Sequence, residues 1–359
     1  MSLHVSLNQN LLIASLTVFI SVLILKPLAK SLKLLDYPGG RKKHQAATPV
    51  IGGIALFIGF TVALVCDAHL FQCTQIFWLF SLLIVFIGVI DDRHDVSARK
   101  RLLIQTFAAF GLTSFGNASL VNVSDLFFDE PIYSYWAAQV FSALMIVAFI
   151  NAMNMLDGLD GLFGGIALSQ NFLLWLISFK LSGEIHHLIS VFLCLLSVFM
   201  LFNVPLPKGK HARILLGDAG STFIAFFVMW VSIVLSQHEQ EASIQSLTIL
   251  WCLLFPLLDL LSVCLIRLCH GKSCFQAGHE HLHYILIGLG MSRVFVSAAI
   301  FSLSLSLGLI GFGLIRLHVR EDVQLALMVG VIFVYLITTY YAHQLTSSDS
   351  SEDDNTIVV

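Results

Sequence analysis

Apolar segments recur along the whole chain, and they restrict its fold more than any other feature. Eleven of them are long enough to hold a membrane-spanning helix of about 20 residues. They lie near residues 10–29, 50–67, 75–91, 102–118, 136–152, 161–179, 187–205, 219–236, 244–267, 294–315 and 322–343. Hydrophobic residues make up 57% of the 359 residues and charged residues only 11%, whereas soluble domains carry about 25% charged residues. We therefore predict an all-α, polytopic integral membrane protein with about eleven transmembrane helices.

The loops between these segments differ in charge, and the difference predicts an orientation. With the N-terminus outside, the cytoplasmic loops hold sixteen of the nineteen lysines and arginines, and only Lys180, Arg316 and Arg320 fall elsewhere. Because basic residues concentrate on the cytoplasmic side, an odd number of helices then places the C-terminus in the cytoplasm. We expect residues 1–345 to form one polytopic membrane domain and residues 346–359 to form a disordered acidic tail.

The stretch at residues 151–161 reads NAMNMLDGLDG and lies between two apolar segments. It places four polar side chains at three-residue intervals: Asn151, Asn154, Asp157 and Asp160. Each such step falls about 60° short of a full helical turn, so Asn151 and Asp160 would face opposite ways on one straight helix. For all four to serve one site the backbone must break, and Gly158 and Gly161 permit a break. We interpret the stretch as a loop with oxygen ligands for a hard cation and its substrate; a merely hydrated linker is the alternative.

Two adjacent carboxylates, Asp91 and Asp92, end the third apolar segment, and Arg99, Lys100 and Arg101 open the fourth. Adjacent carboxylates repel each other unless a cation lies nearby. This arrangement suits a metal-assisted site in which one carboxylate accepts a proton. A helix cap would account for one aspartate, but not for two at the membrane edge.

Asp218 stands where the eighth apolar segment begins, within the sequence LGDAGS. It can be a simple helix cap. The neighbouring glycines also let a ligand approach the backbone, and a helix N-terminus favours anions. Because Asp218 adds to the other carboxylates on the same predicted membrane face, we favour the ligand interpretation.

Two cytoplasmic loops offer groups for phosphate. The first loop carries basic residues among turn formers, including Lys42, and either attracts phosphate or simply follows the positive-inside rule. The last loop holds Cys269 and Cys274, followed by three histidines: His279, His281 and His283. The cysteine spacing does not match the usual zinc fingers, so structural zinc is the weaker alternative to histidines that bind phosphate.

Other polar and sulfur-containing residues lie within the apolar segments or next to them. Asp259 in the ninth segment should face the protein interior, where it either ties helices together or takes part in catalysis. Cys66 and Cys73 flank the first outer loop, and we expect free thiols there, with a disulfide as the alternative.

These motifs occur in the order found in one protein family. They are DYP from Asp36 with Arg41, Lys42, His44, Pro49 and Gly52-Gly53; Asp91-Asp92; NAMNMLDGLDG; LGDAGS; and His281-Leu282-His283. The chain resembles the polyprenyl-phosphate N-acetylhexosamine-1-phosphate transferases, from its first helix to about Arg293. The motifs are specific in combination, although no single one of them would suffice.

The resemblance implies a phosphotransferase reaction on the cytoplasmic face of a bacterial inner membrane. The expected substrates are UDP-N-acetylglucosamine and undecaprenyl phosphate, and the expected products are the lipid-linked diphospho-sugar and UMP. Such a step would initiate a cell-surface polysaccharide of the O-antigen or enterobacterial common antigen type. The family also implies Mg²⁺, with Mn²⁺ as an alternative, and surrounding membrane lipid; nucleic acid is not expected, and a homodimer stays open.

The resemblance assigns roles residue by residue. It implies Asp218 and Asn154 as metal ligands, Asp160 as the contact to the uracil ring, and Asp91 as the base for the lipid phosphate. Asp92 would support that base or the metal, and Asp157 would serve the loop or the substrate. Arg101, His281 and His283 would contact phosphate groups, and we add Asn151, His279 and Lys42 to the substrate-binding set. The chain departs from the family pattern at Tyr284, where close relatives carry a further histidine.

Three other readings stay open. The same chemistry with another UDP-N-acetylhexosamine or with the peptidoglycan precursor is the alternative within the family. An ion-coupled transporter would also carry acidic residues in membrane segments, but near the bilayer midplane rather than at one face. A membrane metallohydrolase would use the cysteine and histidine loop, and its zinc content would distinguish it from a magnesium transferase.

Overall fold

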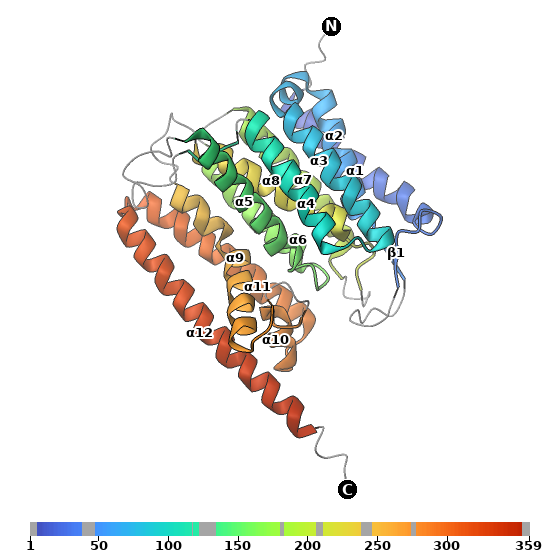
Figure 1. The fold of residues 1–359 in the computed structure, drawn as a ribbon. Coiled ribbons are helices and arrows are strands. Elements are labelled where there is room, and N and C mark those ends of the chain that lie inside the picture. The colour runs from blue at the N-terminus through green and yellow to red at the C-terminus, as the bar shows by residue number, and fades with distance from the viewer. Residues whose placement is uncertain are drawn as a thin grey trace. The chain divides into compact units, whose positions relative to one another are not determined.

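The computed structural model describes residues 6–37, 47–116, 118–121, 134–179, 183–205, 211–237, 246–273 and 278–353. Most of these residues are helical (Figure 1). The helices are α1 (Leu7–Leu28), α2 (Gly52–Cys66), α3 (Ala68–His94), α4 (Ala98–Phe115), α5 (Tyr135–Asn154), α6 (Leu162–Ser178), α7 (Glu184–Asn203), α8 (Gly217–Ser236), α9 (Ser246–Cys269), α10 (Leu282–Gly288), α11 (Arg293–Arg316) and α12 (Glu321–Asp353). Strands β1 (Leu35–Asp36) and β2 (Thr48–Pro49) pair antiparallel.

Every predicted apolar segment corresponds to one helix, and only the short α10 falls outside that set. Within the described residues, eight helices are long and apolar enough to cross a membrane: α1, α3, α5, α7, α8, α9, α11 and α12. Helices α2 and α6 are apolar but shorter. The prediction of an all-α polytopic membrane protein is confirmed, apart from the small two-stranded sheet, while the count of eleven spans and the orientation stay predictions.

The chain divides into two compact units, Met1–Ser246 and Leu247–Val359. Both units fall largely within residues 1–345, which the sequence predicts as one membrane domain. Helix α12 continues to Asp353, into the tail predicted to be disordered, and residues 354–359 lie outside the described part. The assignment of a membrane domain and a disordered tail stays a prediction.

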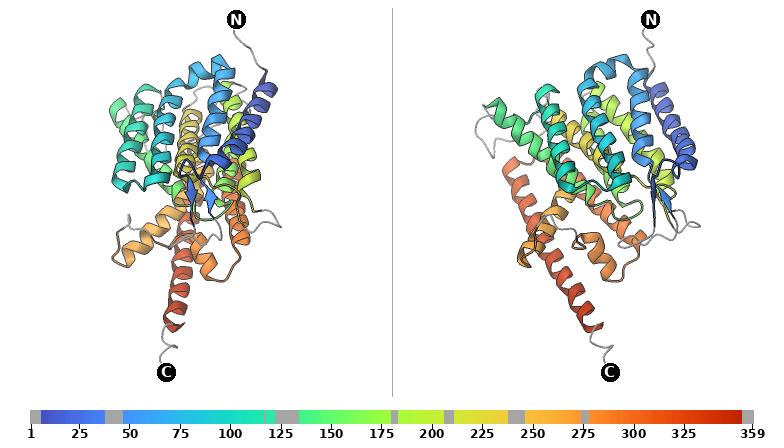
Figure 2. Two further views of the ribbon diagram at one scale, coloured as in Figure 1. Left: turned by 90° about the vertical axis from the view of Figure 1, so that its right-hand side faces the viewer. Right: turned by 45° about the vertical axis from the view of Figure 1, so that its right-hand side comes forward.

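The first unit is organised around α8, which lies among the other helices of the unit (Figures 1 and 2). Sixteen of its twenty residues are buried, and it packs against α2, α3, α5 and α6. Aromatic rings fill this core; Phe192 stacks on Phe227 with ring centroids 3.6 Å apart, and Phe77 stacks on Trp230 at 4.2 Å. A helix that is apolar all round is expected at such a central position. Its N-terminus is therefore held from several sides.

The segment before α8 joins the end of the first loop. The Leu215 N–H donates to the Pro49 carbonyl at 2.8 Å, and the Gly52 and Gly53 N–H groups donate to Leu215 and Leu216 at 2.9 and 3.0 Å. A side chain at Gly53 would collide with the backbone of Gly220, so glycine permits this close approach of α2 and α8. These contacts set the position of the residues that open α8.

The second unit consists of α9 to α12. Helix α10 packs against α11 and α12, and Gly311 of α11 leaves room for the Trp251 side chain of α9. The hydroxyl groups of Ser262 and Thr339 share a hydrogen bond of 2.7 Å between α9 and α12. Hydrogen bonds between helices compensate buried polar groups where water is absent.

Candidate active site

Three carboxylates and one guanidinium group come together in the first unit; we call Asp91, Asp92, Asp218 and Arg101 the carboxylate cluster. Asp91 and Asp92 belong to the last turn of α3, Arg101 to the first turn of α4, and Asp218 to the first turn of α8. The cluster therefore forms where three helix ends meet.

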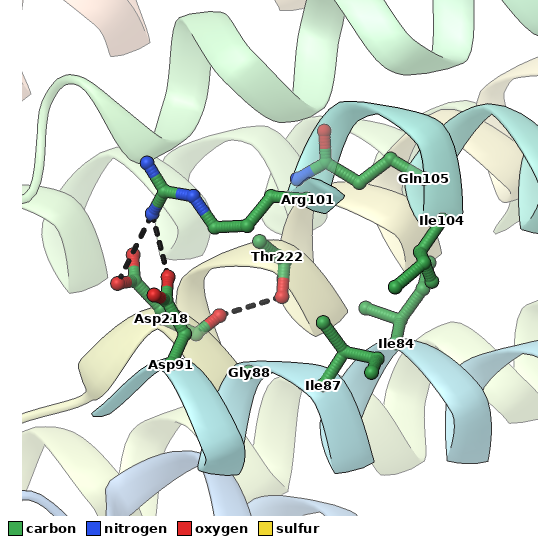
Figure 3. A pocket seen from close by; sticks show the side chains of 9 residues that line it. All are labelled: Ile84, Ile87, Gly88, Asp91, Arg101, Ile104, Gln105, Asp218 and Thr222. Carbon is green, nitrogen blue, oxygen red and sulfur yellow. Dashed lines mark hydrogen bonds and ion pairs between the residues drawn. The ribbon is translucent and has the colours of Figure 1, made fainter. Parts of the chain in front are cut away.

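Arg101 joins two of the carboxylates (Figure 3). Its Nη1 atom lies 2.7 Å from Asp91 Oδ2 and 3.3 Å from Asp218 Oδ2. The second oxygen of Asp91 accepts a hydrogen bond of 2.6 Å from the Val96 N–H. The Asp91 side chain is only 3% exposed, whereas those of Arg101 and Asp218 are each 32% exposed. The cluster is thus buried on the Asp91 side and open on the Asp218 side.

Asp92 caps helix α8 from outside that helix. Its two oxygens accept hydrogen bonds from the Asp218 N–H at 2.8 Å and the Ala219 N–H at 3.3 Å. Gly217 makes this possible, because its φ is +74° and a Cβ there would collide with the Asp92 carboxylate. The cap interpretation therefore applies to Asp92, and the side chain of Asp218 stays available for other ligands.

Asn154 stands beside Asp218. Its Oδ1 accepts a 2.6 Å hydrogen bond from the Ser221 hydroxyl, and its side chain interacts with the Asp218 carboxylate. Asn151 lies one turn earlier on α5 and donates 3.0 Å to Gln105 Oε1 on α4. Of the two amides of the NAMN sequence, Asn154 reaches the cluster and Asn151 reaches Gln105 beside it.

A pocket opens at the cluster (Figure 3). Polar groups of Asp91, Arg101, Gln105, Asp218 and Thr222 line it together with apolar side chains. The apolar part comes from Ile84, Ile87 and Ile104 of α3 and α4, with Gly88 between the two parts. The pocket therefore presents a charged end and an aliphatic end.

The helix breaks where the sequence predicts a loop. Helix α5 ends at Asn154 and α6 begins at Leu162, and Gly161 adopts a φ of +77° at the junction. Of the two glycines predicted to permit the break, Gly161 has a positive φ and Gly158 does not. Asp157 lies exposed in this loop.

Asp160 bonds to the segment that leads into the carboxylate cluster. Its Oδ2 accepts a hydrogen bond of 3.0 Å from the Ala212 N–H. Next to it, Asn203 accepts from the Gly161 N–H at 3.0 Å and donates to the Ile214 carbonyl at 3.1 Å. The loop after α5 and the approach to α8 are thus tied together. Lys42 lies outside the described residues.

The second unit contains a separate group of polar residues, which we call the histidine cluster: Asp259, His281, His283 and Tyr335. Asp259 is fully buried, with 1% exposure, and accepts three hydrogen bonds. They come from His281 Nδ1 at 2.7 Å, the Leu282 N–H at 2.9 Å and the Tyr335 hydroxyl at 3.2 Å. Asp259 therefore ties α9 to α10 and α12, as one of its two predicted roles requires.

The loop before the histidines is anchored by a buried ion pair. Arg267, at 1% exposure, donates to Glu280 Oε2 at 3.0 Å, and Lys272 Nζ lies 4.0 Å from Glu280 Oε1. Burial alone would raise the pKa of Glu280, but the hydrogen bond and charge of Arg267 outweigh it and lower that pKa below its ordinary value.

The three histidines differ in environment. His279 is exposed, while His281 is buried and is oriented by Asp259. His283 is completely buried, and neither ring nitrogen has a hydrogen-bond partner in the described structure. Burial lowers the pKa of His283 to about 4, so the ring is neutral near pH 7. Within the described residues, these side chains and Cys269 form no group of three close metal ligands; Cys274 lies outside that part.

Several residues of both clusters escaped the sequence analysis. Gln105, Ser221 and Tyr335 bond to the predicted site residues Asn151, Asn154 and Asp259, and Thr222 lines the pocket. Asn203 and Arg267 bond to Gly161 and Glu280, which lie next to predicted site residues in the chain. The signal available for Arg267, Gln105 and Asn203 was a polar side chain inside an apolar segment, which is expected to face the protein interior. The others are small or ordinary residues with no such signal.

Comparison with known proteins agrees with this geometry. Residues 74–236 match the family described as Glycosyl transferase family 4, a range that contains the whole carboxylate cluster. Three relatives carry the name undecaprenyl-phosphate alpha-N-acetylglucosaminyl 1-phosphate transferase. The protein from Yersinia pestis is 27% identical over 317 residues, which are 87% of this chain and 86% of the relative.

The other two relatives match different shares of the chain. That from Escherichia coli O157:H7 is 28% identical over 273 residues, covering 74% of this chain and 72% of the relative. That from Haemophilus influenzae is 26% identical over 350 residues, covering 94% and 95%. The resemblance predicted from the motifs is thereby confirmed for this membrane protein.

Proposed function

We propose that this chain transfers N-acetylglucosamine 1-phosphate from UDP-N-acetylglucosamine to undecaprenyl phosphate. An oxygen of the lipid phosphate attacks the β-phosphorus, the bond to UMP breaks, and UMP leaves. The observation that carries the proposal is the carboxylate cluster, in which Asp91 and Asp218 share the Arg101 guanidinium group and Asp92 caps α8 beside them. The names of the three relatives support the choice of substrates.

The charge of the cluster supports a divalent cation. When all three carboxylates are ionised, Arg101 leaves two negative charges uncompensated. Mg²⁺ usually binds one or two carboxylates, substrate phosphates and water rather than a complete protein cage. Asp218 with Asn154 beside it provides such a partial set, and we assign these two residues as ligands of Mg²⁺ or Mn²⁺. A bound ion would neutralise charge on the transferring phosphoryl group.

The remaining residues of the cluster position and neutralise the substrates. Arg101 is one-third exposed beside the carboxylates and is available to a phosphate group. Asp91 holds Arg101 and would accept the last proton of the lipid phosphate, whose second pKa is about 6. We further propose that Asp160 contacts the uracil ring and that His281 and His283 contact the diphosphate.

The two-part pocket suits an acceptor with a charged head and an aliphatic chain. Arg101 and Asp218 lie at one part, and Ile84, Ile87 and Ile104 line the other. Undecaprenyl phosphate has both features, and two of the helices around the pocket, α3 and α8, are long and apolar enough to cross a membrane. We place the site on the cytoplasmic face of the bacterial inner membrane, where UDP-sugars are made, and assign the reaction to the start of cell-surface polysaccharide synthesis.

An isotope-exchange assay tests this proposal. The detergent-purified protein is incubated with labelled UMP, undecaprenyl phosphate, Mg²⁺ and one UDP-sugar at a time, and label entering the UDP-sugar is measured. We expect exchange with UDP-N-acetylglucosamine that requires the lipid phosphate. Asp218→Asn should reduce it by more than about 100-fold, because the substitution removes a full charge from the proposed metal site.

Asp322→Asn is the matched control, since Asp322 is exposed and pairs only locally with Arg320 in the described structure. It should keep wild-type exchange. Exchange with a different UDP-sugar would redirect the substrate assignment within the family. Absence of exchange with every UDP-sugar would refute the transferase proposal and favour a transporter. Full activity of Asp218→Asn would instead refute the assignment of Asp218 as a metal ligand.

A further inference from the structure

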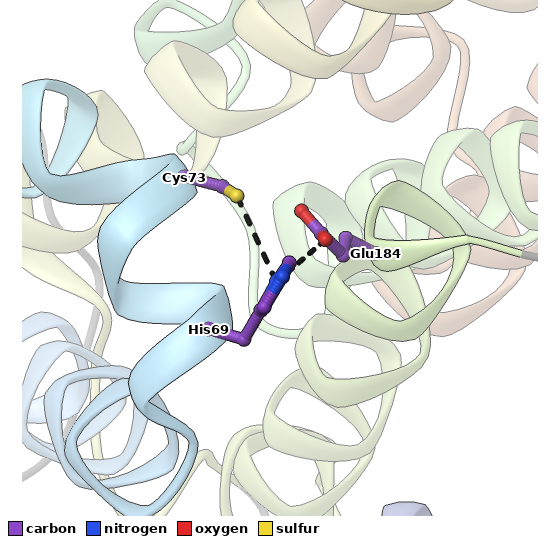
Figure 4. A group of neighbouring side chains, drawn as sticks. All are labelled: His69, Cys73 and Glu184. Carbon is purple, nitrogen blue, oxygen red and sulfur yellow. Dashed lines mark hydrogen bonds and ion pairs between the residues drawn. The ribbon is translucent and has the colours of Figure 1, made fainter.

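A second group of potential metal ligands lies at the other end of α3. His69 and Cys73 are one helical turn apart on α3, and Glu184 opens α7 (Figure 4). One ligand atom from each, His69 Nδ1, Cys73 Sγ and a Glu184 carboxylate oxygen, all lie within 4.8 Å of one another. His69 precedes Asp91 by 22 residues on the same helix, so the two sites are about 33 Å apart. We call this group the α3–α7 cluster.

The backbone positions of this cluster are held by Asp67. One oxygen of Asp67 accepts hydrogen bonds from the His69 and Leu70 N–H groups at 3.1 and 3.2 Å and thereby caps α3. The other oxygen lies 3.8 Å from His187 Nδ1, one turn beyond Glu184 on α7. The two helix ends that carry the ligands are therefore linked through a single side chain.

The ligand types favour zinc over magnesium. Imidazole nitrogen, thiolate sulfur and carboxylate oxygen are the three donors that Zn²⁺ takes in proteins, whereas Mg²⁺ prefers oxygen alone. Three protein ligands leave a fourth position for water. All three side chains are exposed, so an ion can reach them from solution.

The distances are close to those of a zinc site. His69 Nδ1 lies 2.6 Å from Glu184 Oε1 and 4.0 Å from Cys73 Sγ. Zinc bonds of about 2.0 to 2.3 Å in tetrahedral geometry place neighbouring ligand atoms roughly 3.4 to 3.6 Å apart. To bind zinc, the distance from His69 Nδ1 to Glu184 Oε1 must lengthen and that to Cys73 Sγ must shorten, each by less than about 1 Å. Rotation of the exposed side chains allows both changes.

We propose that His69, Cys73 and Glu184 form a Zn²⁺ site that joins the beginnings of α3 and α7. Binding releases the thiol proton to solvent, and the neutral imidazole coordinates through Nδ1 with its proton on Nε2. The ion replaces the hydrogen bond between His69 and Glu184. The site is independent of the transferase reaction and stabilises this end of the first unit.

Metal binding by the full-length protein tests the proposal. The protein is purified in detergent with a non-thiol reductant, stripped with EDTA, and titrated with Zn²⁺ against a chromophoric chelator. We expect Cys73→Ser to bind one Zn²⁺ ion per protein fewer than the wild type. In Glu184→Gln the affinity for that Zn²⁺ ion should fall roughly tenfold or more. Cys66→Ser is the matched control, because Cys66 lies near the same helix ends but outside the cluster, and it should bind as the wild type does.

Two further measurements separate this site from the carboxylate cluster. Co²⁺ in place of Zn²⁺ should give a thiolate charge-transfer absorption that Cys73→Ser lacks and Cys66→Ser retains. Asp218→Asn should still bind the Zn²⁺ ion that Cys73→Ser no longer binds. Equal zinc binding by wild type and Cys73→Ser, absence of the thiolate band, or loss of that ion in Asp218→Asn would each overturn the proposal.

Discussion

The carboxylate cluster and the histidine cluster both contain buried aspartates, but they balance charge in opposite ways. In the first, Asp91 and Asp218 share Arg101, while Asp92 accepts hydrogen bonds from the backbone of α8. In the second, Asp259 receives hydrogen bonds from His281, Leu282 and Tyr335, and Glu280, next to His281 in the chain, has its own arginine. The carboxylates of the first site are short of positive charge, whereas those of the second have their partners within the protein.

This difference separates carboxylates that need a ligand from carboxylates that hold the structure together. Uncompensated buried charge is costly, and a cation or substrate from solution can relieve it. A carboxylate whose bonds are all made by the protein has little to gain from an added ion. Removing a partner should therefore have different consequences at the two clusters.

Replacing Arg267 and Arg101 by methionine tests this comparison, and Arg267→Met has the largest expected effect on stability. Arg267→Met should destabilise the protein by about 3–5 kcal/mol, because it leaves the buried Glu280 without its main partner. Arg101→Met should cost only about 0–1 kcal/mol when Mg²⁺ is present, since Arg101 is one-third exposed and the cation can take over its role. Thermal unfolding in detergent, with Mg²⁺ and with EDTA, measures both.

The double variant Arg267→Met/Glu280→Met controls for lost packing and should recover much of the stability lost in Arg267→Met. Equal losses for the two arginine variants, independent of Mg²⁺, would remove the distinction between the clusters.

Neutralising one aspartate in each cluster should change stability by a smaller amount, and the change should have opposite signs in the two clusters. Asp259→Asn should destabilise the protein by about 1–3 kcal/mol, because the amide cannot accept from both His281 and the α10 backbone. Asp218→Asn should leave stability in EDTA unchanged or raise it, because it relieves repulsion from Asp91. Thermal unfolding with and without EDTA checks the signs; a loss of stability in both variants contradicts the comparison.

The smallest expected effect is a loss of stability at acidic pH that is caused by the buried His283. Burial lowers the pKa of His283 to about 4, with Asp259 opposing the shift and His281 and His279 adding to it. An unfolded histidine titrates near about 6.5, so the unfolded chain binds a proton first as the pH falls. His283 therefore permits full stability above about pH 6.5 and costs stability progressively between there and about pH 4.

The measurement is the unfolding temperature between pH 7.5 and 4.5, where His283→Gln should fall less steeply than the wild type. Glu280, whose pKa is lowered by Arg267, loses its contribution only below about pH 4.5 and does not obscure this range. The same substitution at the exposed His279 is the control and should follow the wild type. Identical slopes for wild type and His283→Gln would exclude a buried neutral His283.

Much of the fold was predictable because the bilayer imposes a simple rule on sequence. The apolar lengths predicted one helix for each segment, and the spaced polar residues with Gly158 and Gly161 predicted a break within residues 151–161, which lies after Asn154. The two-stranded sheet and α10 were not predicted, since strands of two residues and a helix of seven carry too little periodicity. The division into two units left no composition signal within the apolar chain.

The sequence by itself determined the membrane class, the approximate helix positions and the residues that carry chemistry, because polar groups are costly in apolar segments and stand out there. Only the tertiary structure decided which of them act together. In that structure Asp92, rather than Asp218, caps α8, and Arg101 lies between Asp91 and Asp218. Asp259 forms a hydrogen bond with His281. These pairings join residues 10 to 127 positions apart, and such contacts depend on how helices pack rather than on local sequence.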